Sequence, residues 1–491
     1  MTPRRAEVSR QRFLKTALAG AAALALSGCL APKYQLPAVP VAGDYKEAAG
    51  HRDWTAAAPA DQLDRGNWWT LYRDDTLDSL VARLEQNSPT LAAALARYDQ
   101  ARAYYDQSRV SLFPRLSLSG QYEPNRGSDM RPPSGSDTRY FKDNSLGLQA
   151  SYEVDLWGRV RNSVKAGDAS FVAAGDDLAS AQLSLRAQLV DQYLQLRGLD
   201  NTVDLLNRNV DAFARALELT QSRRDGGIAS GLDVARARTQ LQAAKAQRST
   251  SMGQRAVQEH AIAALIGESP SSFSIAPKTT RLAVPQLPTD VPSTLLQRRP
   301  DIAAAERRTA AANASVGVAR AAWFPSLTLG GTVGYQSYQG SDWFKASNLF
   351  WSIGPSLALD LLDGGRRAAQ VDQARALLDE AGARYRVTVL QAFAEVEDNL
   401  ALLDRYQDAA EEEAQAVAAS EHAVELATIR YRQGAVNYLE VTTAQSAALD
   451  AQRDLVTIDT ERLRASVALI RALGGGWANP APAVASAAPP P

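Results

Sequence analysis

The sequence predicts a chain of mixed α and β class, in which strands of membrane-barrel length alternate with long coiled-coil helices. Three observations predict this class: a strand-to-helix junction that occurs twice, heptads of apolar residues, and an internal two-fold sequence repeat. The 491 residues include 53 Lys and Arg against 54 Asp and Glu, so charge gives no argument for a nucleic-acid partner. One cysteine and three histidines rule out a disulfide within the chain and disfavour a His/Cys metal site, so no metal ligands are predicted.

Residues 1–28 have the organisation of a signal peptide. A basic region, Arg4 to Lys15, precedes an alanine-rich apolar core. The segment ends in Leu-Ser-Gly before Cys29 and resembles a bacterial lipobox. This resemblance implies cleavage before Cys29 and a covalent lipid on it, with an S-diacylglycerol and an N-acyl group; an ordinary cleavage site beside a chance cysteine is the alternative. Residues 29–70, rich in Pro, Ala and Gly, are predicted to be a lipidated, extended N-terminal segment.

Two β-hairpins are predicted, at about 114–157 and about 325–362. The second strand of the first hairpin, Leu146–Leu156, alternates apolar and polar residues without a fault, which is typical of a strand with one apolar face. The polar, turn-rich stretch Glu123–Thr138 predicts an exposed loop between the strands. Alternating runs of about ten residues have the length of membrane-barrel strands.

A helix of unusual length is predicted from Arg159 to about Arg224. Its apolar residues recur at steps of three, four and seven, which are the a and d positions of heptads. At about 1.5 Å per residue this helix would approach about 100 Å. Asp225-Gly226-Gly227 breaks it and a second helix starts near Ser230, so a long helical hairpin is predicted at about 158–267.

The second half of the chain copies the first. Gly434 matches Gly227, and Glu440 matches Asp233, at the same offset of about 207 positions. The sequence therefore predicts the following organisation: a first repeat at 71–284, a linker at 285–292, a second repeat at 293–477 with a helical hairpin at about 365–474, and a disordered Ala/Pro tail at 478–491.

Four strands per chain are too few to close a membrane barrel. Lipid satisfies no strand edge, so a spanning sheet must close on itself. Because the smallest known closures need about eight strands, we expect the chain to oligomerise. Three chains would supply a twelve-stranded barrel, with the long helices aligned beneath it as a helical tube.

Several motifs in a fixed order resemble those of the TolC-like outer-membrane factors, especially the efflux lipoproteins of the OprM/NodT type. They cover about Ala31 to Trp477 and are Ala31–Tyr34, Trp68-Trp69, Ser151–Arg159, Leu295–Ile302, Ala322–Leu327, Arg430–Gly434 and Ala472–Trp477. The resemblance implies a homotrimeric, passive exit duct with a barrel in the outer membrane of a Gram-negative bacterium and a helical barrel in the periplasm. It also implies outer-membrane lipid, a periplasmic adaptor protein and an inner-membrane pump, often of the proton-driven RND type, as partners.

The two helix turns are the periplasmic tip that this resemblance implies, and they would contact the adaptor and close the resting channel. The tip residues are Gly226, Gly227, Ser230, Gly434, Val436 and Asn437. Asp233 and Glu440 are candidate constriction residues, because their six copies in a trimer would form an acidic ring. Arg223 and Arg430 are candidates too, since they would pair with acids on neighbouring helices. Two alternatives stay open: the acids cap helix starts, and the arginines lie on solvated faces.

An enzyme is not predicted, because the sequence contains no nucleophile motif, phosphate loop or metal cluster. The predicted cargo is small toxic compounds or drugs, and no cofactor is expected besides the lipid on Cys29. The alternatives are an outer-membrane duct for type I protein secretion or for metal-ion export. The lipobox favours the efflux branch, whereas few His and Met residues do not exclude metal export, since a duct need offer no ligands.

Overall fold

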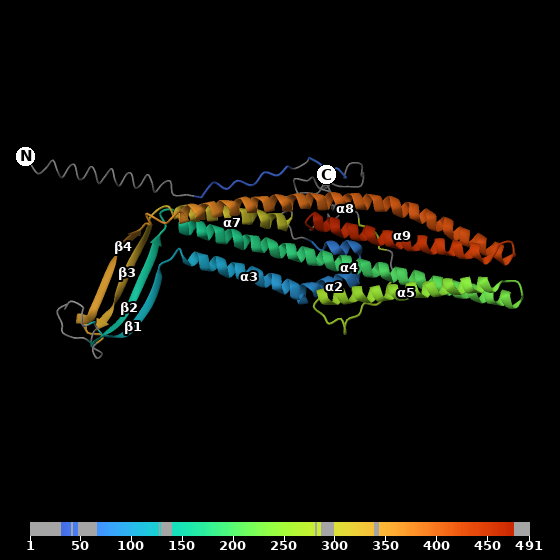
Figure 1. The fold of residues 1–491 in the computed structure, drawn as a ribbon, viewed down its shortest axis with the longest axis horizontal. Coiled ribbons are helices and arrows are strands. Elements are labelled where there is room, and N and C mark those ends of the chain that lie inside the picture. The colour runs from blue at the N-terminus through green and yellow to red at the C-terminus, as the bar shows by residue number, and fades with distance from the viewer. Residues whose placement is uncertain are drawn as a thin grey trace, which may run out of the picture. The chain divides into compact units, whose positions relative to one another are not determined.

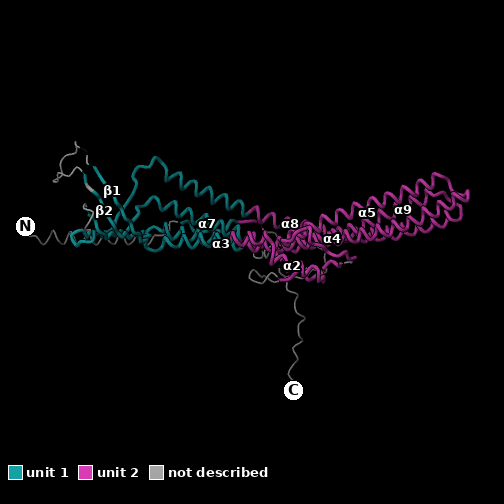
Figure 2. The backbone as a smooth tube through the Cα atoms, turned by 90° about the horizontal axis from the view of Figure 1, so that it is seen from below, with its two compact units in different colours: residues 1–37, 98–175, 304–385 teal, residues 38–97, 176–303, 386–491 magenta. Residues whose placement is uncertain are grey.

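The computed structural model describes residues 31–40, 43–47, 66–126, 128, 140–279, 282–285, 299–337 and 343–475. The predicted signal peptide, Cys29, nearly all of the linker and the C-terminal tail therefore lie outside the described residues. The chain divides into two compact units (Figure 2). Unit 1 comprises residues 1–37, 98–175 and 304–385, and unit 2 comprises residues 38–97, 176–303 and 386–491. Each unit thus takes segments from both sequence repeats.

The elements follow one another in the order that the repeat predicts (Figure 1). Before the first long hairpin lie η1 (Trp68–Tyr72), α2 (Asp75–Asn87), α3 (Pro89–Val110), β1 (Arg115–Arg126) and β2 (Tyr140–Val154), and the hairpin itself is α4 (Arg159–Asp225) and α5 (Gly231–Leu265). The second series is α7 (Pro300–Ala321), β3 (Ser326–Ser337), η2 (Ala346–Asn348), β4 (Leu349–Ala358), α8 (Arg366–Arg432) and α9 (Tyr438–Ala472). Helices α4 and α8 have 67 residues each, which confirms the prediction of unusually long helices.

Unit 1 contains a four-stranded antiparallel sheet in the order β1-β2-β3-β4. The central pair joins the two repeats, with Leu148 opposite Val333 and Val154 opposite Leu327. The first hairpin ladder is longer than predicted, because Arg126 still pairs with Tyr140 where the composition predicted a loop. Cross-strand pairing therefore overrides the local turn propensity at this end of the sheet.

The N-terminal segment of unit 1 lies on α7. The Asn313 side chain donates to the carbonyl of Pro32 at 2.9 Å. Gly317 faces Ala31, and a Cβ on this glycine would lie 2.7 Å from the Ala31 Cβ and 2.7 Å from Nδ2 of Asn162. The absence of a side chain at Gly317 therefore lets the segment approach the helix.

The apolar heptad positions of α4, called the heptad seam below, form part of the core of unit 2. Leu189, Leu196 and Leu206 of α4 are fully buried. Further along the helix, the seam packs in one cluster with residues of α5 and α9: Leu206, Val210, Phe213, Leu241, Ala244 and Leu449. The period of the apolar residues therefore identified the buried face of α4 correctly. None of the described helices combines the length and the apolar character that a membrane span requires.

A buried ionic cluster, centred on Asp200, ties the segment after α5 to α4. Asp200 accepts hydrogen bonds from Arg255 Nε at 2.7 Å, from Arg197 Nη1 at 2.8 Å and from the Lys278 backbone at 3.2 Å. Arg197 also donates to the carbonyl of Ala276. Every charged group at the centre of this cluster thus has a partner, which is the condition for burying it.

Arg299, the residue before α7, has a structural role in unit 2. Its buried guanidinium donates to Asp301, to Glu395 at 2.7 Å and to the carbonyl of Ala472 at 3.0 Å. Ala472 is the last residue of α9, so Arg299 places a positive charge where helix carbonyls lack partners.

Candidate functional site at the helix turns

The two turns that join the long helices have the same backbone geometry. Gly227 has φ +77° and Gly434 has φ +78°, a left-handed conformation that glycine adopts without strain. After α4, the Ile228 amide donates to the carbonyl of Arg223 and the Gly227 amide to that of Arg224. After α8, the amides of Ala435 and Gly434 make the corresponding bonds to Arg430 and Tyr431. Both turns are therefore Schellman motifs.

Side-chain caps start the helix that follows each turn. Ser230 is the N-cap of α5 and forms a capping box with Asp233: its Oγ accepts from the Asp233 amide at 3.1 Å, and Asp233 accepts from the Ser230 amide at 3.1 Å. Asn437 is the N-cap of α9 and accepts from the Leu439 amide at 3.1 Å. The tip residues Gly227, Ser230, Gly434 and Asn437 thus have local roles in ending one helix and starting the next.

The two candidate acids differ in their surroundings. Asp233 is partly buried and occupied by its capping box, which is the helix-cap alternative left open by the sequence. Glu440 is exposed and forms an ion pair with Arg430 at 3.5 Å. The pairing of Arg430 with an acid on the neighbouring helix is therefore present within one chain. The acidic ring stays a prediction. The exposed Glu440 is a better candidate for its acid than Asp233, which is engaged in the capping box.

Arg223 binds backbone rather than an acid. Its Nη1 donates to the carbonyls of Tyr431 at 3.1 Å and Arg432 at 3.2 Å, and its guanidinium lies 4.8 Å from the centre of the Tyr431 ring. Within one chain, the carbonyls at the end of α8 lie within its reach and carry partial negative charge, so they bind it. The pairing of Arg223 with an acid on a neighbouring helix stays a prediction. Arg223 joins the end of the α4–α5 hairpin to the end of the α8–α9 hairpin.

A small apolar cluster lies beneath these contacts. It consists of Ala237, Tyr431, Tyr438 and Val441, with Val436 packed against it. The rings of Tyr431 and Tyr438 meet edge to face at 5.2 Å between centres. Burial raises the pKa of Tyr438 to about 12, so its hydroxyl stays protonated at neutral pH. In the sequence, Tyr431 is part of the motif Arg430–Gly434, and its position three residues before the turn glycine Gly434 was the available signal.

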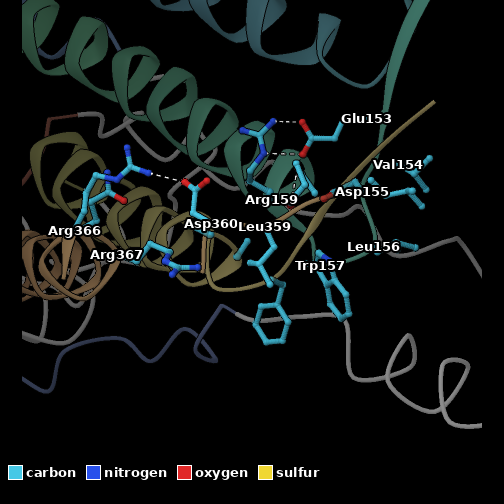
Figure 3. Close-up of a pocket in the computed structure, with 17 residues that line it drawn as sticks. Glu153, Val154, Asp155, Leu156, Trp157, Arg159, Leu359, Asp360, Arg366 and Arg367 are labelled. Atoms are coloured by element: carbon cyan, nitrogen blue, oxygen red, sulfur yellow. Dashed lines mark hydrogen bonds and ion pairs between the residues drawn. The ribbon is translucent and has the colours of Figure 1, made fainter. Parts of the chain in front are cut away.

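A second candidate site is formed by the two strand-to-helix junctions of unit 1, which border a cavity of ≈370 Å³ (Figure 3). Glu153 binds Arg159 at 2.7 Å, and Asp360 binds Arg366 at 3.0 Å. These acids are therefore neutralised by arginines from the starts of α4 and α8. Among the described residues, no group of three or more His, Cys, Asp or Glu side chains is placed to hold a metal ion.

A short antiparallel sheet connected to paired helical hairpins with matching glycine turns defines a channel protein of the TolC-like class. The chain belongs to the outer membrane efflux protein family, whose model matches residues 80–268 and 291–475. This is a family of channels of the outer membrane.

Individual relatives agree with this assignment. The chain is 31% identical over 465 residues to the toluene efflux pump outer membrane protein TtgF of Pseudomonas putida, covering 94% of this chain and 96% of TtgF. It is 34% identical over 432 residues to the pyoverdine export outer membrane protein OpmQ of Pseudomonas aeruginosa, covering 86% and 90%. The solved structure of the outer-membrane channel OprN matches with a TM-score of 0.83 and 32% identity, covering 91% of this chain and 99% of OprN.

Proposed function

We propose that the chain is the outer-membrane channel component of a tripartite efflux system, and that three copies form a passive exit duct for small toxic compounds or drugs. The observation that carries the proposal is the sheet of unit 1, in which β1 and β4 are edge strands of the described chain. A strand edge that faces lipid leaves its backbone N–H and C=O groups without hydrogen-bond partners. Pairing β4 of one copy with β1 of the next supplies these partners. Twelve strands from three copies make a closed barrel within the known size range.

Two kinds of partner follow from this proposal. The glycine turns, with Val436 and Asn437, meet a periplasmic adaptor protein, and the adaptor connects the duct to an inner-membrane pump of the RND type. A lipid on Cys29 anchors the chain to the outer membrane. The relatives TtgF and OpmQ are named for toluene and pyoverdine, although both are about equally similar to this chain. Cargo selection is therefore assigned to the pump rather than to the duct.

Single-channel conductance in planar lipid bilayers tests the duct. The purified wild-type protein should give a small conductance, because the contacts of Arg223 hold the two hairpin ends together at a nearly closed tip. Arg223→Ala should raise the conductance several-fold, since it removes two charge-assisted hydrogen bonds and an aromatic contact between the hairpin ends. Arg208→Ala, which removes an exposed arginine from the same helix, is the matched control and should change nothing. A well-folded protein without conductance in all three forms would contradict the proposal.

A further inference from the structure

The first strand-to-helix junction is closed by an apolar contact within the chain. The ring of Trp157 stacks on that of Phe324 at 4.7 Å between centres, and its Nε1 donates to the carbonyl of Pro325 at 2.8 Å. Trp157 follows β2, and Phe324-Pro325 precedes β3. Because β2 and β3 are neighbours in the sheet, the end of one strand meets the start of the next.

The second junction repeats these residues but lacks the contact. Asp360-Leu361-Leu362 corresponds to Asp155-Leu156-Trp157. Leu361 and Leu362 are 82% and 97% exposed, whereas Leu156 is 38% exposed and Trp157 is half-buried. Phe113-Pro114 corresponds to Phe324-Pro325, and Phe113 is 65% exposed. The repeat therefore supplies both halves of a second contact and leaves both uncovered in the single chain.

The cause is the position of the strands in the sheet. Leu361-Leu362 follows β4 and Phe113-Pro114 precedes β1, and these strands form opposite edges. Within one chain the two edges are separated by two strands, whereas β4 of one copy would lie beside β1 of the next. We propose that Leu361 and Leu362 pack on Phe113-Pro114 of a second copy and form an apolar lock at this junction. The inference rests on the proposed closure of the sheet by copies of the chain.

The turn that presents the two leucines is held by its own polar contacts. Asp363 accepts hydrogen bonds from the amides of Gly365 and Arg367, both at 3.1 Å, and from Arg367 Nε at 2.6 Å. Gly364 and Gly365 take positive φ angles of +64° and +88°. A defined turn therefore presents the two leucines. Their expected partner is a second copy of the chain, because the corresponding contact, Trp157 on Phe324, already exists within one chain.

A cysteine cross-link tests the lock. Phe113→Cys/Leu362→Cys, treated in the membrane with a short bis-maleimide, should run as covalent dimers and trimers on a denaturing gel. Trp157→Cys/Phe324→Cys places the same pair at the first junction and should cross-link within one chain, so it should still run as a monomer. Phe113→Cys and Leu362→Cys alone control for reaction through Cys29, and each should remain monomeric.

Introducing opposite charges at the two positions distinguishes a second protein copy from lipid as the partner of the leucines. Leu362→Asp and Phe113→Lys should each raise, by at least about tenfold, the concentration at which half of the detergent-solubilised chains are assembled. Combining them should restore assembly, because the opposite charges meet across the copies. Monomeric cross-linking products from an assembled protein, or no restoration, would overturn the lock and place the leucines against lipid. Wild-type protein that remains monomeric in light scattering would instead overturn the proposed duct.

Discussion

Removing the carboxylate of Asp200 should destabilise unit 2 strongly. The side chain is 1% exposed and accepts three hydrogen bonds, two of them from arginines. In Asp200→Ala these arginines lose their shared acid, and Arg197 is itself only 3% exposed. Arg197 keeps Tyr193 and the carbonyl of Ala276, and Arg255 keeps Glu259, so the loss falls short of a fully isolated charge.

The expected loss in the free energy of unfolding is about 3 kcal/mol, the lower end of the range for breaking a buried ion pair from one side. Asp204→Ala provides the matched control, because Asp204 lies one turn further along α4 and pairs with Arg208. That pair is 47% and 71% exposed, so its loss should cost less than about 1 kcal/mol.

Chemical denaturation of the detergent-solubilised protein, followed by far-ultraviolet circular dichroism, measures both variants. All samples must have the same protein concentration, since assembly would otherwise shift the apparent stability. If Asp200→Ala lost no more stability than Asp204→Ala, the reasoning that the Asp200 cluster holds the segment after α5 would be refuted.

Two further predictions concern the Asp74 side chain and Gly317. Burial raises the pKa of Asp74, but hydrogen bonds, including one from Lys278, outweigh it and lower the pKa overall. Asp74→Asn should therefore cost about 1 kcal/mol at neutral pH. In urea titrations this difference should begin to shrink as the pH falls below about 4, the ordinary pKa of an aspartate in an unfolded chain, and should vanish below the lowered pKa of the folded carboxylate; a constant difference would contradict this. Gly317→Leu should displace the segment at Ala31, because the new side chain would collide with it, and should speed tryptic cleavage after Lys33. Gly253→Leu, with open space around it, should leave the cleavage rate unchanged. Equal rates in both variants and the wild type would be inconsistent with the contact.

Local signals in the sequence located the helix turns but did not decide the role of every residue there. Glycine at Gly227 and Gly434 predicts a helix end because only a residue without a Cβ takes the left-handed conformation freely. The spacing of Ser230 and Asp233 allowed either a cap or a channel acid. The capping box became apparent only from the distances between backbone and side chain.

The sequence by itself determined the repeat, the alternation of strands and long helices, and the buried seam of α4. These features are periodic, and a period in the chain states directly which residues share a face. The tertiary structure decided contacts between distant residues, such as Arg299 with Ala472, since no local pattern specifies a partner far along the chain. It also gave the two matched junctions different surroundings: Trp157 is covered by Phe324, whereas Leu362 is exposed, because β2 has a neighbour on that side and β4 forms the edge of the sheet.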